Sequence, residues 1–427
     1  MNTVAFERGS RKQLRIHVLP TKRFKTFAIS LYAGVPLRED TVTPVALTPF
    51  VLRRGTESYP ETTQFREQLE HLYGAGFSFD VYKRGDYQIV QFRMDTINDS
   101  FVGGGEQQLL DRSFAFLGEV LTKPARENGH FKTSYVQAER ETVRKKLESI
   151  VNDKMRYAAE RCIEEMCKHE PYRLHPLGER KALPAIEPPE LTATYENWLK
   201  ESSMDLYVVG DTTLEEVEEL VERHFNLERK TSSDYQAQKA VRGDEEPNTV
   251  IERLNIGQGK LNLGLRTSIT YADDKYASAL MYNGILGGYP HSKLFVNVRE
   301  KESLAYYASS RYDGHKGIAT VQSGIEIPNY EKAVTIIKQQ LEEMKLGHIT
   351  DLEMSQTKAM IRNLLKEMQD AAFEMIAYDF NRQLSGKERT SEELLAQIEQ
   401  ITKQDVREAA EQFRLDTIYF LRDEKEE

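Results

Sequence analysis

The hydrophobic and polar positions along the chain follow two periods, and together they predict an α+β fold. Residues 25–33 (KTFAISLYA) alternate with the two-residue period of a strand, and residues 330–345 repeat their apolar positions as an amphipathic helix does. Residues 205–209 form a short apolar run that is typical of a buried strand. The predicted strands are residues 25–33, 77–82, 87–94, 205–209, 260–266, 304–311, 317–325 and 416–421, and the predicted helices are residues 43–52, 63–73, 106–121, 132–168, 195–200, 214–224, 275–286, 292–299, 330–345, 351–368 and 392–400.

The order of these predicted elements occurs twice along the chain. Residues 72–94 (LYGAGFSFDVYKRGDYQIVQFRM) and 303–325 (SLAYYASSRYDGHKGIATVQSGI) share one rhythm of turn, strand, turn and strand. This repetition predicts an internal duplication at a scale of about 200 residues. We therefore expect an αβ sandwich of two tandem homologous domains, each a mixed, largely antiparallel sheet packed with helices. The predicted domains are residues 1–229 and 249–427, joined by a polar linker at 230–248.

Composition narrows the possible functions only by exclusion. The 58 basic and 68 acidic residues give a net charge of −10, which argues against a nucleic-acid partner. No run of about 18 apolar residues occurs, and the first residues lack the apolar stretch of a signal peptide, so we expect a cytoplasmic protein with no membrane partner. Cys162 and Cys167 lie five apart in a helical pattern, which favours two reduced thiols over a disulfide or a zinc site.

Residues 284–306 (GILGGYPHSKLFVNVREKESLAY) form the most informative segment of the chain. The segment resembles one in the C-terminal half of the pitrilysin/insulinase-type zinc peptidases, the inverzincins. In that family an Arg and a Tyr seven residues apart reach the substrate carbonyl at the zinc site, and Arg299 and Tyr306 stand at this spacing. A guanidinium and a phenol are both hydrogen-bond donors suited to a carbonyl or oxyanion. The alternatives are an exposed Arg299 that pairs with Glu302, and Tyr307 as a competing tyrosine that the spacing disfavours.

The zinc-binding motif of the same family, His-x-x-Glu-His, is missing from the sequence. Its usual tail, Lys-Gly-Thr, is recognisable as Arg-Gly-Thr at 54–56, and counting back places the motif on Ala46, Pro49 and Phe50. Neither Ala46 nor Phe50 can bind zinc, and Pro49 cannot act as the general base that activates a zinc-bound water. The resemblance therefore implies that the chain has lost the catalytic half of the site.

Two groups of residues keep a metal hypothesis open. Glu141 and Glu148 are seven apart and resemble the helix that supplies the family's third ligand, so Glu148 is either a remnant ligand or an ordinary solvated glutamate. Glu67, Glu70 and His71 imitate the zinc motif with its first His replaced by Glu. They lie after the Gly-Thr mark, where a plain amphipathic helix is the favoured interpretation.

The resemblance covers nearly the whole chain and implies one half of a clam-shell inverzincin. In family members that work as pairs, one subunit carries the zinc motif and the other supplies the Arg and Tyr. We therefore expect an inactive homologue that supplies Arg299 and Tyr306 to a homologous, zinc-binding subunit of a heterodimeric peptidase, with zinc in the partner and none on this chain. Peptide could add as an extra strand at residues 260–266 or 81–92. The alternatives are a stand-alone peptide-binding or structural protein, and a metallopeptidase with an unrecognised metal site.

Overall fold

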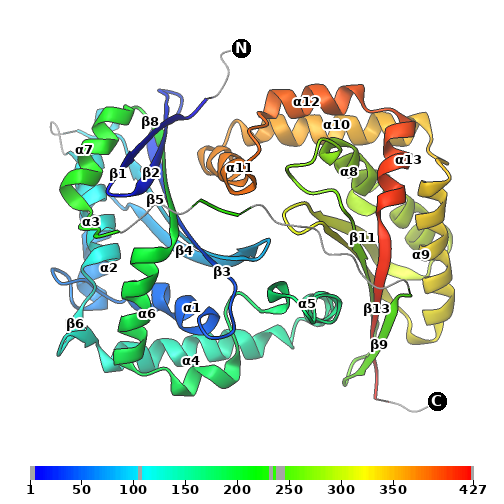
Figure 1. Ribbon diagram of the computed structural model, residues 1–427, viewed down its shortest axis with the longest axis horizontal. Coiled ribbons are helices and arrows are strands. Elements are labelled where there is room, and N and C mark those ends of the chain that lie inside the picture. The colour runs from blue at the N-terminus through cyan, green and yellow to red at the C-terminus, as the bar shows by residue number, and fades with distance from the viewer. Residues whose placement is uncertain (1–4, 104–107, 230–233, 237–245, 425–427) are drawn as a thin grey trace. The chain divides into compact units, whose positions relative to one another are not determined.

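The computed structural model describes residues 5–103, 108–229, 234–236 and 246–424, and it has the predicted α+β architecture (Figure 1). Its residues group into two compact units, each with its own sheet. Unit 1 comprises Met1–Glu148, Leu174–Tyr235 and Gln369–Leu384, and unit 2 comprises Ser149–Arg173, Gln236–Met368 and Ser385–Glu427.

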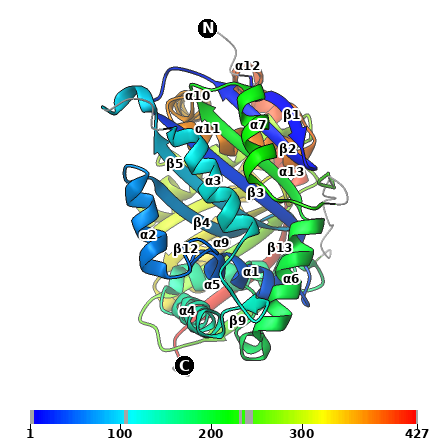
Figure 2. The ribbon, with the colours of Figure 1, turned by 90° about the vertical axis from the view of Figure 1, so that its left-hand side faces the viewer.

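Unit 1 is built on a six-stranded sheet in the order β1-β2-β8-β3-β5-β4. Figure 2 shows α3, α6 and α7 across one face of this sheet, where their apolar sides form the main core. The strands are β1 (Glu7–Arg11), β2 (Leu14–Pro20), β3 (Thr26–Pro36), β4 (Gly76–Arg84), β5 (Tyr87–Ile97) and β8 (Ser203–Gly210), with a small hairpin of β6 (Arg126–Glu127) and β7 (His130–Phe131) beside them. The helices are α1 (Val42–Leu52), α2 (Thr62–His71), η1 (Asp99–Phe101), α3 (Leu109–Thr122), α4 (Thr133–Ile150), η3 (Arg180–Ala185), α6 (Pro188–Glu201), α7 (Leu214–His224) and α11 (Ala372–Ser385).

Unit 2 is built on a five-stranded sheet in the order β11-β12-β10-β13-β9. Figure 1 shows α8, α9 and α13 together on one side of it. The strands are β9 (Asn248–Arg253), β10 (Gly259–Arg266), β11 (Ala305–Asp313), β12 (Ile318–Ile325) and β13 (Arg414–Arg422). The helices are α5 (Lys154–Met166), η2 (Pro171–Arg173), α8 (Tyr276–Asn283), η4 (Gly284–Gly288), η5 (Leu294–Lys301), η6 (Ile327–Asn329), α9 (Tyr330–Lys345), α10 (Asp351–Met368), α12 (Ser391–Gln400) and α13 (Lys403–Gln412).

The two sheets repeat one topology, as the duplicated sequence pattern predicts. The spatial order β2-β8-β3-β5-β4 in unit 1 corresponds strand for strand to β9-β13-β10-β12-β11 in unit 2. In both, the first strand pairs in parallel with the last, and the remaining neighbours pair antiparallel. The sheets are therefore mixed and largely antiparallel. The division at 1–229, 230–248 and 249–427 stays a prediction, and most of the predicted linker lies outside the described residues.

Each repeat contributes one helix to the unit built on the other repeat. The helix α5 follows α4 in the chain but packs on the sheet of unit 2, and α11 follows α10 but packs on the sheet of unit 1. Within unit 1, the ring of Phe380 on α11 stacks on Tyr32 of β3 with centroids 3.8 Å apart. The sheet faces opposite the main helix layers thus gain an apolar cover from a distant part of the chain.

Buried ion pairs hold both exchanged segments. In unit 1, Asp379 of α11 accepts two hydrogen bonds from Arg8 of β1, at 2.5 and 2.8 Å. In unit 2, Glu170 lies 2.6 Å from Arg266 of β10 and 2.8 Å from Lys316. A buried carboxylate is tolerated only when its charge is compensated, so these pairs fix where each segment docks.

The element predictions are correct for the repeated core and fail beside it. The predicted helix at 132–168 is two helices, because Asp153 caps a new helix start by accepting a hydrogen bond from the backbone of Arg156. The strands β1, β2 and β9 and the helices α11 and α13 were not predicted.

Candidate functional site

The three positions of the degenerate zinc motif lie on α1, a helix buried along its whole length. Ala46 is 0% exposed and Phe50 4% exposed. The ring of Phe50 packs edge-on against Phe79 of β4, with centroids 4.8 Å apart. Pro49 sits inside the same helix and offers no hydrogen-bonding group beyond its carbonyl, which accepts from the backbone of Arg53 at 3.2 Å. These positions therefore serve the core of unit 1, and none of them carries a metal-binding side chain.

The carboxylates of α4 are occupied by arginines. Glu148 lies 2.5 Å from Arg144 and 3.0 Å from Arg180, so its carboxylate forms ion pairs with two arginines. Glu141 is bonded by Arg144 as well, and this hydrogen bond lowers the pKa of Glu141 to about 2. The assignment of Glu148 as a remnant ligand stays a prediction.

A third carboxylate on α4, Glu139, was missed by sequence reasoning. Its side chain is buried at 3% exposure, and one oxygen lies 3.5 Å from Arg54, which directly follows the degenerate motif helix. The other oxygen, Oε2, has no hydrogen-bond partner among the described residues. The sequence signal for its burial is helical spacing, which places Glu139 on the same face as Val136 and Val143.

The second metal candidate lies on the solvent side of α2. Glu67, Glu70 and His71 are all exposed on this helix, whose one buried residue is Phe65. Within the ranges that the structure describes, no three His, Cys, Asp or Glu side chains are grouped as metal ligands.

The segment 284–306 takes an unusual backbone form in unit 2. Both η4 and η5 are π-helices, a rare geometry that occurs frequently at functional sites. The glycines of η4 allow a close approach to β11, because a Cβ on Gly287 would lie 2.5 Å from the backbone nitrogen of Ser310. The π-helix η5 in turn contacts β11, so the elements that carry Arg299 and Tyr306 are adjacent.

Arg299 projects from η5 as an exposed side chain. Its guanidinium carbon lies 4.5 Å from the ring centroid of Phe295, one turn earlier on the same helix. Neither an ion pair nor a hydrogen bond engages it among the described residues. The alternative pairing with Glu302 is not formed, because Glu302 lies 2.9 Å from Lys332 of α9.

Tyr306 and Tyr307 occupy different environments on β11. The register between β11 and β12 shifts between Ala305 and Tyr307, so Tyr306 is the extra residue of a β-bulge, and its side chain is 61% exposed. Tyr307 instead packs across Gly324 of β12, where an added Cβ would lie 2.4 Å from its ring. Burial and the charge of Asp153 raise the pKa of Tyr307 to about 12. The bulge thus exposes Tyr306 to solvent, and Tyr306 is the tyrosine that stands seven residues after Arg299.

The predicted site for an added peptide strand at residues 260–266 is wrong. These residues form β10, which pairs with β12 on one side and β13 on the other, so its backbone edges are both occupied. The sheet edges of unit 2 are β11 and β9. In the other predicted segment, residues 81–92, only the part in β4 lies at an edge, because β5 is flanked by β3 and β4.

Comparison with known proteins identifies the family to which the chain belongs. The family described as "Peptidase M16 inactive domain" matches residues 185–361. A Bacillus subtilis protein named "Probable inactive metalloprotease YmfF" is 40% identical over 411 residues, which span 96% of each chain. The chain belongs to the M16 peptidase family. It is an inactive homologue of the pitrilysin/insulinase-type metalloproteases, as the lost motif led us to expect.

Solved structures agree with this membership. A conserved protein from Enterococcus faecalis V583 is 32% identical, has a TM-score of 0.91 and is matched over 99% of both chains. An M16 inactive domain from Pseudomonas fluorescens shares the fold at 17% identity, with a TM-score of 0.82 over 100% of this chain and 99% of that one. Among the described residues, no helix is both long enough and apolar enough to cross a lipid bilayer.

Proposed function

We propose that this chain is the non-catalytic subunit of a heterodimeric zinc peptidase. In this proposal a homologous subunit with an intact His-x-x-Glu-His motif binds zinc and carries out the chemistry. The present chain binds the peptide substrate and donates hydrogen bonds from Arg299 and Tyr306 to the carbonyl under attack. The observation that carries the proposal is that both donors are exposed, lie on adjacent elements and are unpaired in the described part of the chain.

The physical argument rests on where charge develops during peptide hydrolysis. Attack on a carbonyl places negative charge on its oxygen, and donors aimed at that oxygen stabilise the transition state. A guanidinium that is already paired with a carboxylate would be a weaker donor, and its side chain would be turned away from substrate. Arg299 is held by the ring of Phe295 alone, which orients the guanidinium without using its N–H groups.

The experiment combines this chain with an M16 homologue that carries the zinc motif. We expect the two proteins to co-purify and the mixture to hydrolyse peptides that neither hydrolyses alone. Substitution Arg299→Ala should lower turnover on the order of a hundredfold or more, as removal of an oxyanion donor does, while assembly is unchanged. The matched control is Arg414→Ala, an exposed arginine of the same unit on β13, which should leave turnover unaltered.

Two outcomes would contradict the proposal. If the complex forms and Arg299→Ala turns over like the wild type, the chain does not supply this donor. If the chain binds peptides but no zinc-binding homologue, it acts as a stand-alone peptide-binding protein.

A further inference from the structure

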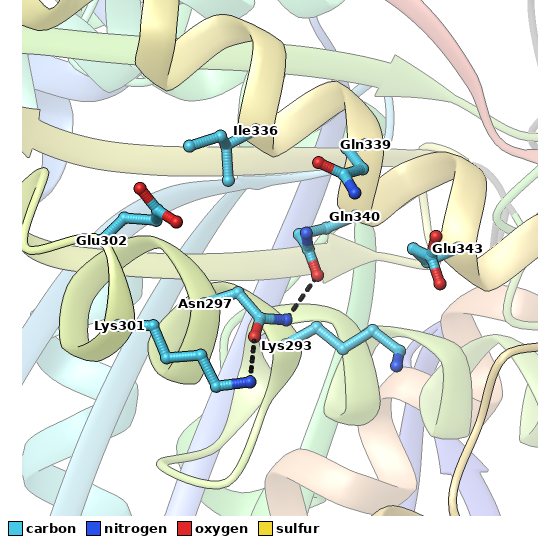
Figure 3. A pocket seen from close by; sticks show the side chains of 8 residues that line it. All are labelled: Lys293, Asn297, Lys301, Glu302, Ile336, Gln339, Gln340 and Glu343. Carbon is cyan, nitrogen blue, oxygen red and sulfur yellow. Dashed lines mark hydrogen bonds between the residues drawn. The ribbon is translucent and has the colours of Figure 1, made fainter.

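A polar cavity of about 330 Å³ lies between η5 and α9 in unit 2 (Figure 3). This volume is at the lower end of the range for small-molecule sites. Three of its residues come from η5 or its flanks at every fourth position, which places them on the face of the helix that turns toward α9. The lining consists of Lys293, Asn297, Lys301, Glu302, Ile336, Gln339, Gln340 and Glu343.

A chain of two hydrogen bonds fixes the orientation of the amides on the cavity wall. Lys301 can only donate, so the Asn297 atom that it contacts at 3.1 Å is the carbonyl oxygen. The amide nitrogen of Asn297 therefore faces Gln340 and donates to its Oε1 at 2.6 Å. This leaves the Nε2 group of Gln340 as a donor on the side away from Asn297, toward Ile336 and Glu302 (Figure 3).

The Nε2 group of Gln340 is a donor at the cavity that no described protein group uses. Gln340 as a whole is only 5% exposed, but its Nε2 is not one of the fully buried unpartnered atoms, so it is open to the cavity while it donates to no described protein group. A ligand that offers an oxygen atom here exchanges the bond between Nε2 and water for a bond to the ligand, so Gln340 contributes mainly the direction of binding.

The charged residues of the cavity differ in whether their hydrogen-bonding groups are already used within the protein. Glu302 forms an ion pair with Lys332 at 2.9 Å, and Glu343 lies 2.7 Å from the Nδ1 atom of His348, a ring that carries a positive charge only when it is protonated. Lys301 contacts one neutral acceptor, and the two other N–H groups of its ammonium remain available. The groups of the cavity that remain available are therefore hydrogen-bond donors, and one of them, the ammonium of Lys301, carries a positive charge.

The remaining lysine of the lining is not part of this capacity. Lys293 is held by Glu353 at 3.0 Å and by the carbonyl oxygen of His348 at 2.7 Å. Its charge is neutralised within the protein, and its ammonium lies at the end of the cavity away from Lys301 (Figure 3).

We propose that this cavity is a binding site for a small carboxylate, and specifically for the C-terminal carboxylate of a short peptide. Lys301 supplies the charge, Gln340 supplies the directed hydrogen bond, and the side chain of Ile336 offers the one apolar contact for a small side chain. The amide of Gln339 on the rim can pair with a peptide group. Free small carboxylates share the same head group, and a peptide differs from them by these additional contacts.

This site is separate from the pair of residues assigned to catalysis in the complex. Arg299 lies midway in sequence between Asn297 and Lys301, about half a helical turn from both, and so on the other face of η5. The proposal does not depend on the proposed peptidase function, since it concerns binding to this chain alone. A ligand held by Lys301 and Gln340 would nevertheless link α9 to η5, the helix that carries Arg299.

The test is titration of the purified chain, without any partner, by isothermal calorimetry. The probes are L-alanyl-L-alanine, its C-terminal amide and sodium acetate. We expect saturable binding of the dipeptide, loss of binding for the amide, and weaker binding of acetate. Equal binding of dipeptide and acetate would assign the site to free carboxylates, and equal binding of dipeptide and amide, or no binding at all, would overturn the proposal.

The decisive variant is Gln340→Glu. A carboxylate at this position still accepts the hydrogen bond from Asn297 but replaces the free donor by a charged acceptor. Affinity for the dipeptide should fall on the order of tenfold to a hundredfold, the value of a hydrogen bond to a charged group. The control is Gln356→Glu on the exposed side of α10, which adds the same charge in the same unit and should leave affinity unchanged. Unaltered affinity in Gln340→Glu would contradict the site, and the circular dichroism spectrum verifies that the variant is folded.

Discussion

Glu302 lies 2.9 Å from Lys332, and this ion pair between the end of η5 and α9 engages the carboxylate that stands three residues after Arg299. An arginine followed three residues later by a glutamate would ordinarily be expected to pair with it. Here the acid is turned toward another helix, and the guanidinium stays exposed. The availability of Arg299 is therefore a product of Lys332, a residue far from it in the sequence.

This relationship predicts an effect of Lys332→Ala on the proposed peptidase complex. Loss of the ammonium frees Glu302 to pair with Arg299, so turnover should fall several-fold although the changed residue touches no substrate. The double variant Lys332→Ala, Glu302→Gln removes the competing charge and should recover most of the activity. Steady-state kinetics of the two complexes measure this, and failure of the second substitution to restore turnover would show that Lys332 acts in another way.

The two neighbouring tyrosines should respond differently to loss of the hydroxyl. In the mixed complex, Tyr306→Phe should lower kcat by about tenfold or more, because the exposed phenol is the proposed donor to the reacting carbonyl. Tyr307→Phe keeps the ring in its place over Gly324 and should leave kcat near the wild-type value. Comparison of the two rates under saturating substrate decides the assignment, which an equal loss in both variants would refute.

Gly324→Ala should destabilise unit 2 although it adds only one methyl group. The new Cβ would lie 2.4 Å from the Tyr307 ring, which must then leave its place on the sheet. We expect a loss of about 1–3 kcal/mol in the free energy of unfolding, the usual cost of overpacking. Urea unfolding measures this loss. The double variant Gly324→Ala, Tyr307→Ala should not show the additional clash, and a fully additive double variant would argue against direct contact.

The stability of unit 1 should depend on acid pH through Asp205. Burial acts to raise the pKa of this carboxyl, but hydrogen bonds from Arg15 and His17 outweigh it and lower the pKa from 3.8 to about 2. A folded-state pKa below the unfolded one means that the charged form stabilises the fold above about pH 4. This contribution, on the order of 2 kcal/mol, is lost as the pH falls from about 4 to 2.

The measurement is urea unfolding at a series of pH values between 7 and 2. Asp205→Asn should be less stable at neutral pH and should show a shallower decline in acid. Asp211→Asn, at an exposed position just after the same strand, serves as the control and should follow the wild-type curve. Parallel curves for wild type and Asp205→Asn would contradict the prediction.

Phe380→Ala should weaken the unit that is built mainly from the first half of the sequence. Phe380 is 1% exposed and stacks on Tyr32, so its removal leaves a cavity under the sheet of unit 1. A loss of about 3–5 kcal/mol is expected in the free energy of unfolding. The reporter should be Trp198, the single tryptophan, which lies in α6 of unit 1. Tyr378→Ala, a partly buried aromatic position on the same helix, is a milder comparison, and an equal effect of both would argue against a specific role for the stack.

The parts of the fold that the sequence predicts are those with strong local periodicity. The strands β3, β10 and β12 alternate or run apolar over their length, and the amphipathic helix α9 begins and ends where its pattern does. By contrast, β1 (ERGSR) carries mostly polar residues and is placed by tertiary contacts, its pairing with β2 and the bonds of Arg8 to Asp379. The helix α11 has an apolar side whose partner lies in the other repeat, which no local pattern reveals.

In the candidate site too, local features can be predicted from the sequence and tertiary ones cannot. The spacing of Arg299 and Tyr306 could be read directly, and so could the absence of the zinc motif. Which strand lies at a sheet edge depends on strand order, and order is set by tertiary pairing, so residues 260–266 were placed at an edge although β10 lies inside. Helical spacing places Glu139 on the same face as Val136 and Val143, but that this face is buried with a glutamate in it depends on packing within the fold.

The exchange of α5 and α11 also bears on how the chain would respond to a cut. The described units require the polypeptide to pass from one to the other five times, at residues 148–149, 173–174, 235–236, 368–369 and 384–385. A protease site inserted between residues 230 and 248 would sever just one of these passages. Each fragment would still hold a helix that completes the hydrophobic core of the other, so the pieces should remain associated and behave as complementing fragments.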